Sequence, residues 1–423
     1  MNHLKDLVLS CFDRDELLTL ALKVLGTPSP QTELFEREPQ VLDFIWKVVE
    51  PYLLGLGLDT TTDPMGNIFA RIGAPPTAAT AAAAPAARAS SGSPGGSPHG
   101  GSLMLVGYAM TPQAGQMADA FKGMVVSGDR YGYTGECLRG RGSCEQKGAL
   151  AAMMYAVGLV EKARRCAGVR FDGSLVFLCS TAGETGRHDA VDCALDNLPG
   201  KPGLAVVGLG TSNQVCLGNK GRIDVIIEVH GRASHSSAPH EGVNAIEGAR
   251  LVLNALSGLA PRGAHESLGE STFAPMHIES FPRATHTIQD LCVIAYDRRL
   301  LPGETPEAAL DEIRWTVSGI EGFGIEVKQG PLMYPSEVSR NSRVASLLSE
   351  SFSAVTGLAP SFTYFKSSLD AGLLNLRGVE TVMFGPGDTR FAHTSDEVVP
   401  VEQLEQAAKA YAHAALKVLC GDR

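Results

Sequence analysis

Three polar side chains could together hold a divalent metal ion. Glu145 stands in a glycine-punctuated loop, Glu184 follows the apolar run 175–179, and His393 follows the apolar run 381–384. Carboxylate oxygens and imidazole nitrogens are ligands that Zn²⁺ and Mn²⁺ accept. Catalytic groups of open α/β sheets gather where strands end. Each residue alone is also compatible with an ordinary exposed loop position, because charged and polar loop residues are usually solvated. Spacing along the sequence does not show whether the three side chains meet in space.

Strand and helix patterns alternate around these residues. Short continuous apolar runs are typical of strands buried on both faces, and apolar residues at helical spacing predict amphipathic helices. Thr305 and Pro306 fit the N-cap and the first position of a helix. We expect buried strands at 175–179, 204–207 and 381–384, and helices at 148–163, 244–259 and 306–317. The pattern predicts an α/β fold with a mixed, mostly parallel sheet flanked by helices.

Length and composition narrow the class of protein. The 423 residues exceed what one core usually holds, which favours two domains. The formal net charge of -10, with no basic stripe, argues against a nucleic-acid partner. The nine cysteines include no Cys-x-x-Cys pair, and no apolar run reaches the length of a membrane span or has the flanks of a signal peptide. We expect a cytoplasmic protein with no membrane contact.

One segment, 74–101, consists almost entirely of Ala, Pro, Ser, Gly and Thr. It offers little to bury, so it is expected to be a disordered, low-complexity insertion. Because 66–73 and 102–107 both have strand patterns, we expect it to interrupt a hairpin rather than to separate domains.

An ordered set of motifs resembles one known family. The chain is similar to the aminoacylase, acetylornithine deacetylase, succinyl-diaminopimelate desuccinylase and carboxypeptidase G family of two-zinc hydrolases. The motifs are TPSP at 27–30, GNI at 66–68, GRGSCEQKG at 140–148, GRASHSSAP at 231–239, GVNAI at 242–246, DRRLLPGE at 297–304 and the stretch around His393. The resemblance implies a catalytic α/β domain at 1–217 and 330–423. It also implies an inserted α/β sandwich lid at 218–329 that forms a homodimer.

The first metal position departs from this family. The resemblance implies a metal-binding histidine at position 108 and an aspartate at position 110, but this chain has Tyr108 and Met110. A further carboxylate is expected at position 209, where Leu209 stands. Protonated tyrosine is a poor ligand and leucine cannot coordinate. We expect this position to be empty.

The second metal position keeps its donors. The resemblance assigns it Glu145, which replaces a bridging aspartate, together with Glu184 and His393. Gly183 replaces the glutamate that acts as general base in the family. We therefore expect at most one divalent metal, zinc or manganese, or none.

The substrate-binding residues of the family persist. His235 corresponds to a lid histidine that polarises the scissile carbonyl, Asn244 to a lid amide that contacts substrate, and Arg299 to an arginine that binds a substrate carboxylate. Gly385 and Gly387 fit a loop whose backbone lies close to a ligand. An alternative interpretation makes His235 and Asn244 caps and Arg299 part of a salt bridge.

Three hypotheses follow. The favoured one is a hydrolase of an amide or related C–N bond in a small carboxylate-bearing compound, such as an N-acyl amino acid or a dipeptide. Tyr108, Glu145 and Glu184 with His393 would supply acid-base groups, and His235 would act on the carbonyl. The second is a non-catalytic homologue that binds a metabolite or a protein partner. The third makes Cys144 a nucleophile activated by His393, although the adjacent carboxylate disfavours a thiolate.

Overall fold

The structure, a computed structural model, describes residues 2–73, 101–168, 171–183, 185–259 and 263–421. The chain forms two compact units. The first contains Met1–Gly218, Val338–Thr363 and Leu373–Arg423, and the second contains Asn219–Glu337 and Tyr364–Gly372. Over the described residues, no helix combines the length and the apolar character that crossing a membrane requires.

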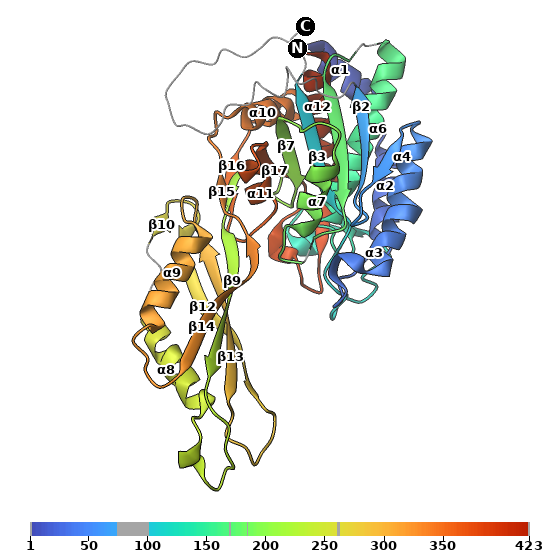
Figure 1. Ribbon diagram of the computed structural model, residues 1–423. Coiled ribbons are helices and arrows are strands. Elements are labelled where there is room, and N and C mark those ends of the chain that lie inside the picture. The colour runs from blue at the N-terminus through green and yellow to red at the C-terminus, as the bar shows by residue number, and fades with distance from the viewer. Residues whose placement is uncertain (1, 74–100, 169–170, 184, 260–262, 422–423) are drawn as a thin grey trace. The chain divides into compact units, whose positions relative to one another are not determined.

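A mixed sheet forms the centre of the first unit (Figure 1). Its strands run in the order β1-β2-β6-β3-β7-β17-β8, and β6, β3, β7 and β17 are parallel to one another. Every residue of β3, β6 and β7 is buried, which explains why their sequences are continuously apolar rather than alternating. This confirms the predicted α/β fold with a mixed sheet, although only its four central strands are parallel, because the pairs β1-β2, β2-β6 and β17-β8 are antiparallel.

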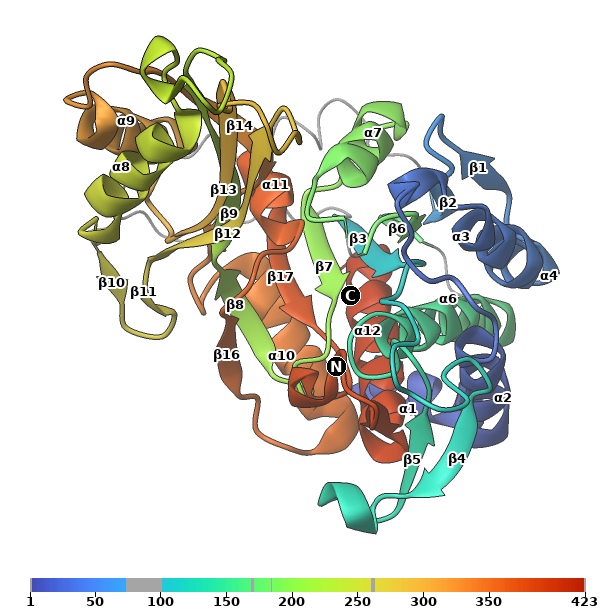
Figure 2. The same ribbon diagram turned by 90° about the horizontal axis from the view of Figure 1, so that it is seen from below.

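The helices of the first unit cover both faces of this sheet. β6 and β7 lie on opposite sides of β3, so the crossovers β3-α6-β6 and β6-α7-β7 travel in opposite directions across the sheet. Right-handed crossovers in opposite directions place their helices on opposite faces. Figure 2 accordingly shows α7 across the strands from α6 and α12.

The elements of this unit have the following bounds. The helices are α1 (Asn2–Cys11), α2 (Arg14–Leu25), α3 (Pro39–Phe44), α4 (Glu50–Gly55), α6 (Lys147–Ala167), α7 (Asp189–Asn197), α10 (Arg343–Thr356) and α12 (Val401–Cys420). The strands are β1 (Thr60–Thr62), β2 (Ile68–Gly73), β3 (Ser102–Tyr108), β4 (Met124–Ser127), β5 (Glu136–Arg139), β6 (Ser174–Ser180), β7 (Leu204–Gly208), β8 (Val215–Asn219), β17 (Glu380–Phe384) and β18 (Val398–Pro400). β16 (Phe362–Phe365) and α11 (Ala371–Leu376) lie where the chain passes between units.

The prediction that β2 and β3 form a hairpin is wrong. Both strands pair with β6, which lies between them, antiparallel to β2 and parallel to β3. β6 is buried along its whole length and supplies the apolar neighbour that both strands need. The low-complexity segment between them falls, apart from residue 101, outside the described residues.

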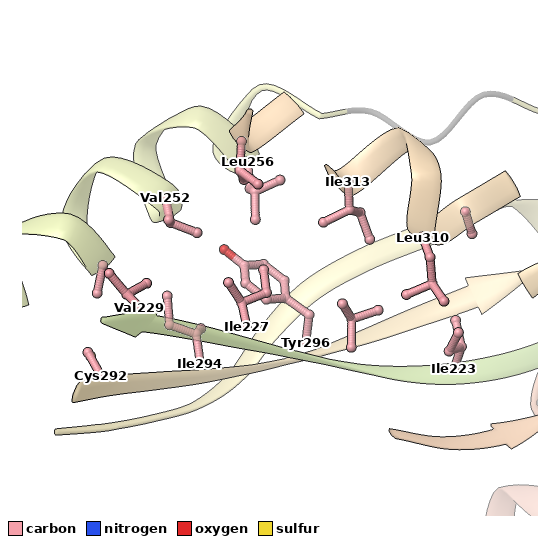
Figure 3. Close-up of a cluster of buried hydrophobic side chains, with 14 of the residues drawn as sticks. Ile223, Ile227, Val229, Val252, Leu256, Cys292, Ile294, Tyr296, Leu310 and Ile313 are labelled. Atoms are coloured by element: carbon pink, nitrogen blue, oxygen red, sulfur yellow. The ribbon is translucent and has the colours of Figure 1, made fainter. Parts of the chain in front are cut away.

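A four-stranded antiparallel sheet with two helices on one face forms the second unit. Its order is β12-β13-β9-β14. Alternate residues of β9 and β13 are buried, so one face of the sheet contacts the helices (Figure 3). Val252 and Leu256 of α8 and Leu310 and Ile313 of α9 close this core. Thr305 caps α9 by accepting a hydrogen bond from Ala308 N–H, as predicted.

The sequence patterns located the helices α8 and α9 but did not locate the edge strands of this sheet. β12 is an edge strand and largely exposed, with Pro275 at a register shift, so it lacks the apolar signal of a strand. The bounds are β9 (Gly221–His230), α8 (Ala245–Ser257), β10 (Ala264–His265), β11 (Gly269–Glu270), β12 (Thr272–Phe281), β13 (Leu291–Leu300), α9 (Pro306–Val317), β14 (Gly324–Met333) and β15 (Ser336–Glu337). The expected bounds of this unit were 218–329; in the structure β14 continues to Met333, the unit to Glu337, and Tyr364–Gly372 also belongs to it.

Candidate active site

The candidate site lies in the first unit, where the carboxyl ends of the parallel strands meet. Tyr108 is the last residue of β3, and Leu209 directly follows β7. His393 lies beyond β17, just after a short 3₁₀ helix at Thr389–Phe391. Strands that run parallel bring these loops to one edge of the sheet. The parallel arrangement of the strands therefore explains why residues far apart in sequence lie at the same edge of the sheet.

Glu145 and His393 are in direct contact. The His393 Nε2 lies 3.2 Å from the Glu145 Oε2. The Glu145 side chain is largely buried, and its Oε2 accepts no hydrogen bond within the described part of the chain. Carboxylate oxygens and imidazole nitrogens are ligands that a divalent metal ion accepts. The structure thus brings together two of the three predicted metal ligands.

A buried ion pair holds the two loops that carry these residues. The Arg141 Nη1 donates to the Glu397 Oε2 at 2.9 Å and to the Thr394 carbonyl at 3.0 Å. The Cys144 N–H donates to the Glu397 Oε1 at 3.3 Å. Both side chains of the ion pair are 1–2% exposed. The pair therefore joins the loop of Glu145 to the loop of His393.

Sequence reasoning did not single out Arg141 or Glu397. Both stood in the quoted loops, but a charged loop residue is normally solvated. One feature of the sequence could have indicated this pair. Arg141 and Glu397 carry opposite charges and stand in two loops that the resemblance places at one site. Charges that are fully removed from water are normally paired.

Cys144 is a buried thiol and not an activated nucleophile. Its Sγ lies 3.5 Å from the Glu397 Oε1, and its side chain is completely buried. Burial and the charge of Glu397 raise the pKa of the Cys144 thiol well above its ordinary value. Burial also raises the pKa of the Glu397 carboxyl, while the Gly142 N–H and Arg141 oppose that change. These contacts argue against the thiol mechanism.

The first metal position of the family is filled by buried, mostly apolar side chains. Tyr108, Met110 and Leu209 are at most 2% exposed. At position 183, an added Cβ would lie 2.7 Å from the Met110 carbonyl oxygen. The residues present therefore do not fit a two-metal centre.

A single metal fits the remaining donors better. The orphaned Glu145 Oε2 and the nearby His393 Nε2 offer two ligand atoms, and Glu184, the third predicted donor, lies outside the described residues. Over the described residues, the grouping of three donors that could hold an ion is Glu228, His230 and Glu326 in the second unit. There the Lys328 ammonium already lies 2.6 and 3.1 Å from the two carboxylates.

Gly385 and Gly387 are needed for packing inside the first unit. An added Cβ at position 385 would lie 2.6 Å from the Leu209 carbonyl oxygen, and one at position 387 would lie 2.6 Å from the Cys144 Cα. Gly387 also has a φ of 98°, and its N–H donates to the Gln403 Oε1. Both positions therefore have no room for a larger side chain.

His235 and Asn244 lie in the second unit, His235 in a β-bridge with Thr287 and Asn244 at the start of α8. The His235 Nδ1 lies 2.7 Å from the Ser237 Oγ and accepts from the Ser237 N–H at 3.2 Å. The Nε2 therefore carries the ring proton in the neutral form. Asn244 is the N-cap of α8, and its Oδ1 accepts from the Ile246 N–H at 3.0 Å.

Arg299 stands on the face of the second sheet that the helices do not cover. Its guanidinium binds both oxygens of Asp297, at 2.8 and 3.1 Å, and its Nη1 donates to the Ser367 Oγ at 3.2 Å. The preceding Arg298 is instead buried and pairs with Glu304 at 2.6 Å. Successive side chains of β13 point to opposite faces of the sheet, so Arg298 is buried while the side chain of Arg299 is 23% exposed.

Comparisons with known proteins agree with this fold. The peptidase dimerisation domain of the M20 type matches residues 217–319. The acetylornithine deacetylase of Myxococcus xanthus is 28% identical over 344 residues, which cover 78% of this chain and 83% of that protein. The uncharacterized protein YgeY of Escherichia coli K12 is 28% identical over 303 residues, covering 66% and 72%. The M20 family metallo-carboxypeptidase Sso-CP2 of Sulfolobus solfataricus has a TM-score of 0.69 at 15% identity, with 95% and 98% of the chains covered.

The fold is that of the solved M20 metallo-carboxypeptidase. Residues 217–319 match the M20 peptidase dimerisation domain, and the relatives of the chain include an acetylornithine deacetylase. This confirms the family resemblance that the ordered motifs predicted.

Proposed function

We propose that this protein hydrolyses an amide or related C–N bond in a small carboxylate-bearing compound, an N-acyl amino acid or a dipeptide. The observation that supports this most directly is the contact between His393 and the orphaned Glu145 oxygen at the strand ends. A carboxylate that is shielded from water and lies beside an imidazole can accept a proton from an attacking water. Two of the relatives named above are called an acetylornithine deacetylase and a metallo-carboxypeptidase, names that refer to removal of an acetyl group and to cleavage of a peptide.

Each residue of the candidate site would have a separate role in the hydrolysis. Glu145 would accept the proton of the attacking water, and His393 would orient that carboxylate. The Tyr108 phenol, at the end of β3, would donate a hydrogen bond to the developing oxyanion. His235, with its proton on Nε2, would polarise the carbonyl. Asn244 and Arg299 would bind substrate, as would the loop of Gly385 and Gly387.

In a metal-bound form of the site, Glu145, Glu184 and His393 would hold one divalent ion, zinc or manganese, and Glu145 would then be a ligand rather than the proton acceptor. When bound, such an ion supplies Lewis-acid polarisation of a carbonyl or of water. We further propose a homodimer, because the second unit contains the dimerisation domain.

An isosteric variant tests the function. Glu145→Gln removes the proton acceptor without changing its shape, and should lower kcat for N-acyl amino acid hydrolysis by roughly 10²-fold or more. Glu33→Gln alters an exposed carboxylate and should leave kcat unchanged. A screen of N-acyl amino acids and dipeptides with both variants provides the measurement. Equal activity of wild type and Glu145→Gln would rule out this role.

The non-catalytic alternative has its own supporting observation. The general-base position is a glycine against the Met110 carbonyl, and the buried Leu209 occupies a ligand position. A binding protein would show saturable binding of an N-acyl amino acid in calorimetry and no turnover above that of Glu145→Gln. Turnover that depends on Glu145 would exclude it.

A further inference from the structure

Three cationic side chains gather in the second unit, outside the pair of loops that carries Glu145 and His393. Lys220 directly precedes β9, Arg299 is near the end of β13, and Lys366 directly follows β16. We propose that these three residues form an anion site for two carboxylates, so that the ligand is a small dicarboxylate. This inference rests on the proposed function, because it specifies the substrate class of that activity.

Hydrogen bonds on both sides of Lys366 define the cluster. The Lys220 backbone N–H donates to the Phe365 carbonyl at 3.2 Å. The Arg299 Nη1 donates to the Ser367 Oγ at 3.2 Å. The two neighbours of Lys366 are thus attached to the other two members of the cluster. Arg222 pairs with Arg299 in the register of β9 and β13, which brings Lys220 close to the same end of the sheet.

The charges around the cluster do not balance. Arg222 binds Asp224 at 2.8 Å and Asp297 at 3.2 Å, and Arg299 binds Asp297 at 2.8 Å. These two arginines and two aspartates neutralise one another. Within the described residues, neither Lys220 nor Lys366 has a carboxylate at ion-pair distance, and the Lys220 Nζ donates to the Glu270 backbone carbonyl. Two positive charges therefore remain.

The titration of Lys220 supports this arrangement. Burial lowers the pKa of the Lys220 ammonium, the positive charges of Lys366 and Arg299 lower it further, and Glu270 opposes the change. Like charges that the fold holds together repel one another, and a bound anion relieves that repulsion. Arg299 uses its Nε and Nη2 on Asp297, so the outer Nη1–Nη2 edge of the guanidinium faces one ligand carboxylate, and the two ammonium groups match the second.

Binding of a matched pair of probes tests the inference. N-acetylglutamate and N-acetylglutamine have nearly the same shape, but only the first carries a second carboxylate. Isothermal titration at constant ionic strength should show about tenfold tighter binding of N-acetylglutamate, the value expected for one additional charged hydrogen bond. Lys366→Met should remove most of this preference and leave N-acetylglutamine binding unchanged.

Lys328→Met provides the control. Lys328 is also an exposed lysine of the second unit, but Glu228 and Glu326 neutralise it. This variant should retain the full preference for N-acetylglutamate. Inorganic phosphate serves as a third probe and should bind more weakly than N-acetylglutamate, because it cannot span the guanidinium and both ammonium groups.

The outcomes separate this inference from the proposed function. Equal affinity for both N-acetyl compounds, tighter binding of phosphate, or the same loss in Lys328→Met would overturn the dicarboxylate site. If N-acyl amino acids are cleaved without any preference for a second carboxylate, the inference fails and the proposed function stands. If N-acetylglutamate binds preferentially through Lys366 but no N-acyl compound is cleaved, the anion site stands and the hydrolase proposal fails.

Discussion

The Met110 carbonyl oxygen lies 2.7 Å from the point where a Cβ would stand at position 183. Positions 110 and 183, at both of which this chain departs from the family pattern, therefore meet in one close backbone approach. A side chain at position 183 would require the chain after β3 to move.

Gly183→Ala should destabilise the protein by about 1–3 kcal/mol, because the obstacle is a backbone oxygen and cannot rotate away. Gly203→Ala is the matched control, since nothing lies within 4 Å of an added Cβ there. Urea unfolding of both variants provides the comparison. Wild-type stability of Gly183→Ala would show that this loop is easily displaced.

Arg141→Met should cost about 3–5 kcal/mol of folding free energy, because it leaves the buried Glu397 carboxylate without its partner. The exposed pair of Arg14 and Glu136 offers a contrast, and Arg14→Met should cost at most about 1 kcal/mol. The double variant Arg141→Met/Glu397→Gln should lose less than Arg141→Met alone. Similar losses for the two arginine variants would contradict a buried charge pair.

His413 should make the protein sensitive to acid. It is 3% exposed, neither ring nitrogen has a hydrogen-bond partner among the described residues, and burial, aided by Lys417 and opposed by Glu350, lowers its pKa to about 4. The unfolded chain binds a proton near pH 6.5 and the folded chain does not, so stability falls as pH decreases from about 6.5 towards 4.

Unfolding at pH 7.5 and 4.5 measures this contribution. The wild type should lose about 2 kcal/mol more than His413→Leu over this interval. His277→Leu, which changes a histidine with 64% side-chain exposure, should behave like the wild type. Identical pH profiles for the wild type and His413→Leu would refute the assignment.

The edge strand β12 should form the interface of a homodimer. Met276 and Ile278 on this strand are 69% and 50% exposed, which is unusual for large apolar side chains at a sheet edge. Met276→Asp should raise the dimer dissociation constant at least tenfold, because the interface would bury a charge. Light scattering should report twice the chain mass for the wild type and for the control Trp315→Asp. A wild-type monomer at micromolar concentration would contradict the interface.

Local signals predicted most of the fold. The N-cap Thr305 and the apolar periodicity located α9, and continuous apolar runs located β6, β7 and β17. β12 was missed because exposed edge strands carry little apolar pattern, and the hairpin was wrong because the pairing of β2 and β3 with β6 depends on the whole sheet.

The site was predictable only in part. Resemblance indicated that Glu145 and His393 belong together, and the structure places them in contact. The pair of Arg141 and Glu397 joins residues 256 positions apart, and no local pattern reveals such a partner. The cluster of Lys220, Arg299 and Lys366 likewise depends on three separate strands meeting at one end of the second unit.

Elemental analysis of protein purified without added metal tests the central claim most directly. At most one divalent ion per chain should be found, and Glu145→Gln should lower that content while Glu326→Gln, which alters the acidic group of the second unit, should not. Chelation should leave the fold intact. Two equivalents of zinc per chain, with activity abolished by a chelator and restored by zinc, would contradict an altered centre that binds one metal or none.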